Sequence, residues 1–186
     1  AGTTVRLLTN GAVCTTLDVT AYDVFQLNTQ QLTLNGDTAT TTPLVVGGTY
    51  TGNTGTTVFA NTSATDTVIP ITNASYLNVS LAPTAPEIFR PGGAALTLAA
   101  TGTFTVGANA TYNTSDGVAN RALTVPGLMT VTGTFTDGAG AAANTTLSGG
   151  LTSGAGVITL ATGAVIFNAG ATLTLTGNND SFNDVQ

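Results

Sequence analysis

The chain has little charge and lacks two of the basic residue types. Its 186 residues include no histidine and only three cationic side chains, Arg6, Arg90 and Arg121, against nine acids, for a formal net charge of −6. A nucleic-acid-binding surface needs a patch of cations to neutralise phosphates, and three scattered arginines do not form one. The same shortage argues against binding to an anionic membrane surface. We therefore expect no nucleic-acid partner.

The missing residue types also exclude the commonest catalytic and metal sites. Without histidine or lysine the chain lacks Ser–His and Ser–Lys nucleophile pairs, and zinc sites lack their usual ligands. Cys14 is the only cysteine, so it forms no intrachain disulfide. Most of the nine acids lie in Gly/Asn/Ser turns, where aspartate caps its own backbone. We therefore expect no enzymatic activity and no obligatory cofactor.

Long apolar runs are missing as well. No stretch of about 18 apolar residues occurs, so we expect no membrane insertion, and no signal-peptide pattern is present. The first residues, Ala1-Gly2-Thr3, fit either a processed signal peptide or a removed initiator methionine. The chain has no tryptophan and four tyrosines, which weakens the case for a carbohydrate-binding module.

Threonine and glycine fill the space that charges usually occupy. About 41 threonines and 23 glycines are present, and threonine is β-branched, which suits a pleated strand. From Leu96 to Val106 every second residue is apolar or small, as in a half-buried strand. The pattern predicts an all-β chain. Only Thr20–Gln31 offers a helix, with Thr20 and Asp23 imitating a capping box, and Val24 with Phe25 equally favours a strand there.

One decapeptide recurs in the second half. TGTFTVGANA begins at Thr101 and TGTFTDGAGA at Thr132, alike at eight of ten positions and 31 residues apart, and a worn copy, TGAVIFNAGA, begins at Thr162. A period near 30 residues predicts a stack of similar β units. Because two and a half repeats are few for a solenoid, we favour a jelly-roll-like β-sandwich built from Gly/Thr-rich repeated strands. A β-solenoid is the alternative.

Proline and glycine mark a break in the middle of the chain. Residues 83–93 contain three prolines followed by two glycines, a composition that favours irregular backbone. We interpret them as a linker or crossover between an N-terminal β region, 1–82, and a repeat-containing β region, 94–186, in what could also be one continuous domain. The expected core residues are Leu96, Leu98, Phe104, Val106, Val131, Phe135, Ile158, Leu160, Leu173 and Leu175.

Two kinds of binding or modification site are suggested by asparagine and aspartate. Clusters of side-chain oxygens could hold calcium, with Asp180, Asp184 and Asp37 as candidate ligands, although plain turns explain them better. Asn-x-Ser/Thr sequons outnumber the roughly four expected from composition and suggest glycosylation of a secreted chain. They occur at Asn61, Asn73, Asn78, Asn109, Asn113, Asn144 and Asn179.

The repeats support a resemblance. From Leu151 onward, LTSGAGVITLATGAVIFNAGATLTLTGNND resembles the Gly/Thr/Ala-rich repeats of bacterial surface proteins and of bacteriophage fibre and decoration proteins. The whole composition resembles S-layer proteins and the subunits of extracellular filaments. The resemblance implies a structural protein and transfers no functional residue.

The leading hypothesis is a subunit of an extracellular or cell-surface polymer, a pilus-like filament or surface layer, whose partners are copies of itself. Sheet edges accept strands from other chains, and the chain lacks the lysines that usually block such pairing. The segment containing Thr3, Val5, Leu7 and Thr9 could be a donated strand, or else the ordinary first strand of its own subunit. The alternative function is a virion-surface protein: a capsid decoration, spike or tail fibre.

Overall fold

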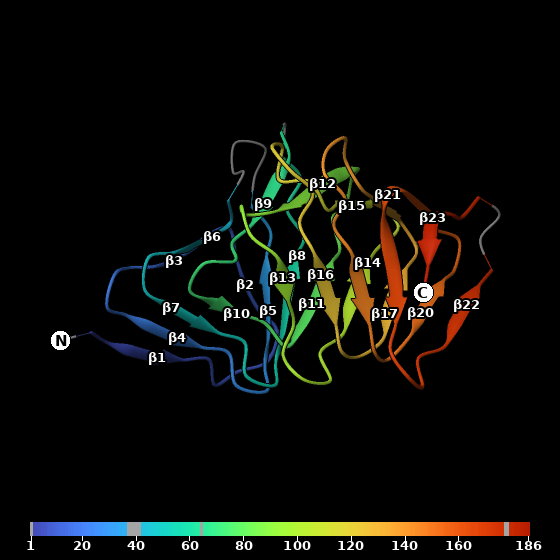
Figure 1. Ribbon diagram of the computed structural model, residues 1–186. Coiled ribbons are helices and arrows are strands. Elements are labelled where there is room, and N and C mark those ends of the chain that lie inside the picture. Colours follow the sequence, from blue (N-terminus) through green and yellow to red (C-terminus); the bar gives the residue numbers. More distant parts are fainter. Residues whose placement is uncertain (1, 37–41, 64, 177–178) are drawn as a thin grey trace.

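The protein is all-β in a computed structural model that describes residues 2–36, 42–63, 65–176 and 179–186 (Figure 1). No helix occurs among these residues, which confirms the predicted class. Every strand-to-strand ladder in them is parallel, from β1–β4 to β21–β23. The β-sandwich prediction is therefore wrong, because its adjacent strands pair antiparallel through hairpins. The alternative, a β-solenoid, is confirmed.

The chain winds in coils of three short strands. The first coils contain β1 (Thr4–Arg6), β2 (Ala12–Cys14), β3 (Leu17–Val19), β4 (Val24–Gln26), β5 (Gln31–Leu34), β6 (Leu44–Val46), β7 (Thr49–Thr51), β8 (Thr56–Phe59), β9 (Thr67–Ile69), β10 (Ala74–Ser75), β11 (Asn78–Leu81) and β12 (Glu87–Pro91). The later coils contain β13 (Leu96–Thr97), β14 (Phe104–Val106), β15 (Ala110–Asn113), β16 (Leu123–Val125), β17 (Met129–Val131), β18 (Thr134–Thr136), β19 (Thr145–Leu147), β20 (Leu151–Ser153), β21 (Val157–Phe167), β22 (Leu173–Leu175) and β23 (Ser181–Val185).

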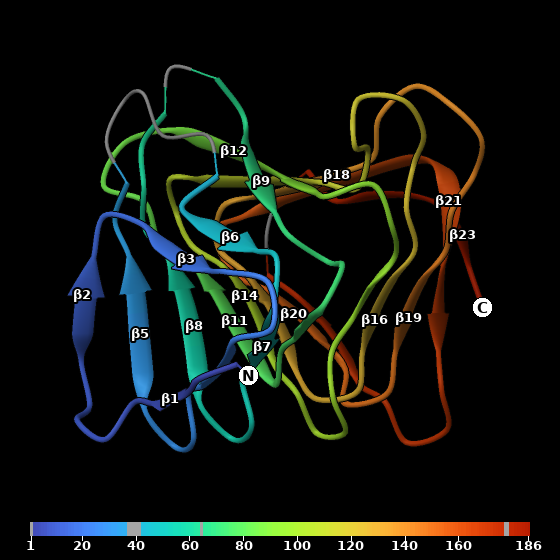
Figure 2. The same ribbon diagram turned by 90° about the vertical axis from the view of Figure 1, so that its left-hand side faces the viewer.

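Equivalent strands of successive coils form three faces. The first face runs β1-β4-β7-β10 and resumes at β13-β16-β19-β21, with the Ala99 N–H donating to the Tyr76 carbonyl (2.8 Å) between its two parts. The second face is the eight-stranded sheet from β2 to β22, whose first members stand side by side in Figure 2. The third face begins with β3-β6 and continues as β9-β12-β15-β18-β21. The long strand β21 bends from the third face to the first, and β23 follows it.

The decapeptide repeat is not the structural repeat. Paired residues are separated by one coil, which spans 20 residues between Ala12 and Leu32 and 27 between Leu96 and Leu123. Phe104 lies in β14 on the second face, whereas its counterpart Phe135 lies in β18 on the third. A 31-residue step therefore advances one coil and one face, so it alone indicates neither coil length nor strand neighbours.

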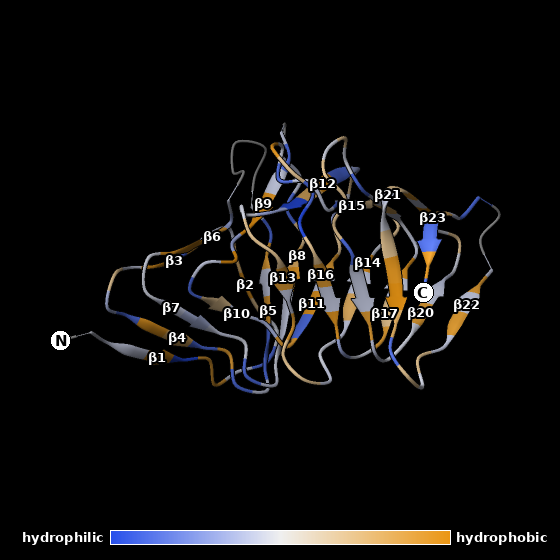
Figure 3. Cartoon of the chain, viewed as in Figure 1, coloured by the Kyte–Doolittle hydropathy of each residue, from blue (hydrophilic) through white to orange (hydrophobic). Residues whose placement is uncertain are grey.

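Alternate residues fill the interior along the whole stack. Eight of the ten predicted core residues are buried, and the two exceptions are Leu173 and Leu175, 39% and 42% exposed. These two lie in β22, the last strand of the second face, so they are covered from one side alone. In Figure 3 the long strand β21 is largely orange, whereas the terminal strand β23 carries both blue and orange.

Two local predictions fall within regular structure. The proposed helix over Thr20–Gln31 is wrong: Thr20 and Asp23 form a turn, in which Tyr22 has φ +73°, and Val24–Gln26 form β4 as the alternative predicted. Within residues 83–93, Glu87–Pro91 form β12, which pairs with β9 and β15. The arginine and both flanking apolar residues of this strand continue the third face. The division into two domains stays a prediction.

Candidate functional site at the N-terminal end

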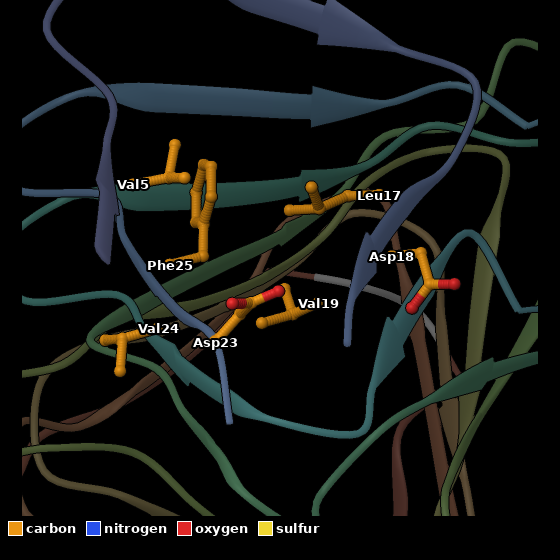
Figure 4. Close-up of a pocket in the computed structure, with 7 residues that line it drawn as sticks. All are labelled: Val5, Leu17, Asp18, Val19, Asp23, Val24 and Phe25. Carbon is orange, nitrogen blue, oxygen red and sulfur yellow. The ribbon is translucent and has the colours of Figure 1, made fainter. Parts of the chain in front are cut away.

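A pocket opens at the N-terminal end of the stack, between the first and third faces. Its volume is about 150 Å³, and it is lined by Val5, Leu17, Asp18, Val19, Asp23, Val24 and Phe25. Figure 4 shows Val5 and Phe25 on one side of this space with Leu17 and Val19 across from them. Apolar side chains from β1, β3 and β4 therefore form a partly open compartment.

The pocket is the interior of the first coil. Val5 pairs with Phe25, and Phe25 pairs with Tyr50 in the next coil, their rings stacked with centroids 5.8 Å apart. Leu17 on the third face pairs with Leu44. Tyr50 and Leu44 are completely buried, whereas Val5 is 49% exposed. The same inward position is therefore core in one coil and pocket wall in the coil at the end.

One carboxylate holds the rim of the pocket together. Asp23 Oδ1 accepts a hydrogen bond from the Thr3 backbone N–H (2.9 Å), and Oδ2 accepts one from the Thr20 hydroxyl. The Thr20 hydrogen bond, followed by that of Thr3, lowers the pKa of Asp23, against weak desolvation. Asp23 is therefore ionised at neutral pH, and it ties the start of β1 to the turn before β4.

The predicted assembly segment lies beside this pocket. Its central residues form β1, which pairs with β4 of its own chain, and the Leu7 N–H donates to the Gln26 carbonyl (2.9 Å). Val5 faces the pocket, Leu7 packs against the core, and Thr3 and Thr9 flank the strand. The segment is thus an ordinary strand in this structure. Its donation to another chain stays a prediction.

The three candidate calcium ligands are not brought together where the structure describes them. Asp180 Oδ1 accepts a hydrogen bond from the Ile158 N–H (2.9 Å), and Asp184 accepts one from the Gln186 side chain. Asp37 lies outside the described residues. Among those described, no three His, Cys, Asp or Glu side chains are grouped to hold a metal. The calcium prediction gains no support.

The seven sequon asparagines differ widely in exposure. Asn61 is completely buried and donates to the Thr67 hydroxyl (2.5 Å), which leaves no room for a glycan. Asn78 and Asn113 are half-buried, with Asn78 bonded to the coils on both sides. The exposed sequon asparagines are Asn73, Asn109, Asn144 and Asn179. Glycosylation stays a prediction, and these four have space for it.

Sequence reasoning missed the polar side chains that join neighbouring coils. The Asn78 amide donates to the Gly55 carbonyl (3.3 Å) and its oxygen accepts from the Thr103 N–H (3.1 Å). Asn53 similarly donates to Asn28 Oδ1 (3.4 Å). Asn28, Asn53 and Asn78 recur every 25 residues. That spacing is the signal in the sequence that gives a coil length directly.

Carboxylates serve the same architecture. Asp137 accepts hydrogen bonds from the Ala161 N–H (2.9 Å) and from the N–H and hydroxyl of Thr162 (both 2.7 Å), at the bend of β21. Glu87, to which the sequence assigned no role, is buried and accepts from the Thr67 hydroxyl and the Ser63 N–H (both 2.6 Å). These groups are engaged in holding loops and coils.

Comparison with known proteins gives no assignment. No protein-family model, curated protein or solved structure was found to match the chain. Among the residues that the structure describes, none forms a helix long and apolar enough to cross a membrane. The function must therefore be argued from the coil stack itself.

Proposed function

We propose that this protein is a non-enzymatic structural subunit that self-assembles into an extracellular surface polymer, a filament or a surface layer. The observation that carries the proposal is the continuity of the three parallel faces through the described chain. Each face has a first and a last strand with a ladder on one side, and such strand edges readily accept another chain.

The end strands lack the usual protection against edge pairing. Natural edges are commonly blocked by lysines, prolines, bulges or covering segments. The chain contains no lysine, and β2 (Ala12–Cys14) and β22 (Leu173–Leu175) carry no charge. Val13 of β2 is 60% exposed. These edges favour assembly of copies, as the proposal requires.

The lateral surface suits an assembly whose sides remain in water. On the second face Thr105, Thr130, Thr152 and Thr174 occupy equivalent positions in successive strands. Three of them are half-buried and Thr174 is exposed, while their neighbours in the strands point inward. Such a ladder offers hydroxyls to water with little charge. The exposed sequons add sites where glycans would coat the sides of the polymer.

A virion-surface role is the second candidate. A stack of coils is a stiff, extended body, which a spike or tail fibre also needs, and the repeat of residues 101–110 and 132–141 resembles such proteins. Negative-stain electron microscopy of native material, with intact mass on the same sample, separates the two. Filaments or sheets with excess mass at the sequons are the expected result. Unmodified mass on icosahedral or tailed particles would replace the first proposal by the second.

The N-terminal segment gives a test of self-assembly in the purified protein. Deletion of residues 1–9 removes β1 and its edge, so we expect a folded monomer that does not polymerise. Circular dichroism reports folding, and sedimentation velocity reports size. Deletion of residues 1–2, which leaves β1 intact, is the matched control and should still assemble. Polymers formed by the longer deletion would contradict the proposed role of this segment in self-assembly.

A further inference from the structure

We propose that copies of the chain stack head to tail, so that the last coil of one copy seats on the pocket in the first coil of the next. This inference rests on the proposed function and adds the two surfaces and their register. The N-terminal end surface comprises Val5, Ala12, Cys14, Leu17 and Phe25. The C-terminal end surface comprises Leu173, Leu175, Phe182 and Val185.

Strand direction favours this arrangement. All ladders between the described strands are parallel, so each coil offers the next an edge of one polarity. A second copy translated along the stack would present β22 to β2, and β23 to β1 and β3, as further parallel strands. A head-to-head pair would reverse the strands and require antiparallel ladders. Head-to-tail stacking therefore continues the hydrogen-bond pattern that the chain already uses.

The inward positions at the two ends match in chemistry on every face. Val5 begins the first face and Val185, which pairs with Val165, ends it. Ala12 and Cys14 begin the second face, which ends at Leu173 and Leu175. On the third face Leu17 stands at the start and Phe182, paired with Leu160, at the end. Apolar groups would thus meet apolar groups around the whole interior.

Several of these inward side chains are poorly covered within one chain. Exposure reaches 49% for Val5, 42% for Leu175 and 47% for Val185. The corresponding residues one coil deeper, Ser153 and Val165, are completely buried. The pocket of about 150 Å³ equals the size of an apolar cavity that accepts a benzene ring. A ring such as that of Phe182, or the Val185 side chain, therefore fits the space beside Val5 and Leu17.

Charge at the two ends of the first face gives the same orientation. Arg6 lies in β1 at one end, and Asp184 lies in β23 at the other. Head-to-tail stacking brings these opposite charges to one junction, whereas head-to-head stacking pairs Arg6 with a second Arg6. Exposed ion pairs contribute little to affinity but penalise the wrong orientation when like charges meet.

The single cysteine allows a direct test of register. If β22 continues the second face, Leu175 lies opposite Cys14 of the next copy, because each occupies the last position of its strand. In L175C, mild oxidation should give a disulfide-linked ladder of dimers, trimers and larger species on a non-reducing gel. T174C is the matched control, because residue 174 would oppose Val13, and it should give less than a tenth of this ladder. Equal ladders, or none from L175C, would overturn the register.

A mixing experiment tests polarity independently of disulfide geometry. V5K blocks the N-terminal surface and V185K blocks the C-terminal surface, so each variant alone should sediment as a monomer. Their equimolar mixture keeps one good surface of each kind and should form one-to-one dimers without filaments. T4K, a charge on the neighbouring residue of β1, should still polymerise, and circular dichroism should show all three variants folded.

The outcomes separate the inference from the function on which it rests. Wild-type polymers together with polymers of V5K alone would overturn head-to-tail stacking and leave the structural function standing. A wild-type chain that sediments as a monomer at every concentration, and forms no filament in native material, would overturn both. Stacking of the end surfaces by another part of the same polypeptide would give that second result.

Discussion

The middle of the stack and its N-terminal end use the same inward positions with different results. In the middle, Phe104, Tyr112 and Phe135 are completely buried, and the ring centroid of Tyr112 lies 4.9 Å from that of Phe104 and 6.0 Å from that of Phe135. At the end, Phe25 stacks on Tyr50 on one side and borders an open pocket on the other. In a solenoid, burial therefore depends on covering coils in both directions, and an uncovered coil is an unfinished interior.

The largest difference between the two regions should appear when an aromatic ring is removed. Phe104→Ala or Phe135→Ala should lower the free energy of unfolding by about 3–5 kcal/mol, because transfer and cavity terms add at a fully buried site. Phe25→Ala should cost about 1–2 kcal/mol, since its ring is covered on one side. Urea unfolding followed by circular dichroism measures each change.

An exposed aromatic residue provides the control for this series. Tyr22 is 88% exposed, so Tyr22→Ala should change the unfolding free energy by less than about 0.5 kcal/mol. Equal costs for Phe25→Ala and Phe104→Ala would show that the end coil is as well packed as the middle. A cost below about 1 kcal/mol for Phe104→Ala would remove it from the core.

The same comparison explains how far the sequence alone leads. Alternation identified the strands and most of the core, because the period of two survives in either parallel or antiparallel sheets. It could not give their pairing: strands of two to five residues dominate, and the 31-residue repeat joins Phe104 to Phe135 on different faces. Leu173 and Leu175 were misplaced because alternation predicts which side a residue faces, while coverage depends on the next coil. The pocket was missed for that reason.

Backbone contact between coils provides the next test. A Cβ on Gly133 would lie 2.1 Å from the Gly107 carbonyl oxygen and 2.2 Å from that of Ala110. Gly133→Ala should therefore cost about 1–3 kcal/mol or more, because two coils must separate at a corner. At Gly154 the nearest atom to a Cβ would be Thr132 Cγ2 at 3.5 Å, so Gly154→Ala is the matched control. Similar thermal midpoints for the two variants would contradict close packing of the coils.

Asp137 predicts how the bend of β21 responds to pH. Desolvation acts to raise its pKa, but the hydrogen bonds from Ala161, Thr162 and Gly163 together outweigh it, and the pKa is lowered. The ionised form thus stabilises the fold above the unfolded-state pKa near 4, and this contribution is lost as pH falls through the lower folded value. Asp137→Asn should cost about 1–2 kcal/mol at pH 7.

Thermal unfolding between pH 7 and pH 2 checks this prediction. The difference between wild type and Asp137→Asn should shrink as pH falls below about 4, where both side chains become neutral. Asp18→Asn is a suitable control, because Asp18 lies exposed on β3 at the other end of the stack. A difference that stays constant down to pH 2 would show that the charge of Asp137 does not stabilise the bend.

The smallest expected effect sharpens the comparison of middle and end most directly. Asn78 joins coils on both sides, whereas Asn28 donates to the Leu7 carbonyl (3.1 Å) and so holds the first coil to the second. Asn78→Ala should lower the global unfolding free energy by about 1 kcal/mol. Asn28→Ala should leave it nearly unchanged and instead speed hydrogen exchange at the Leu7 amide, because the end coil can open alone. If copies stack as inferred, assembly should restore slow exchange at Leu7 in the wild type and the variant alike, since the first coil then becomes an interior one. Fast exchange that persists in the polymer would mean that the end coil remains uncovered after assembly.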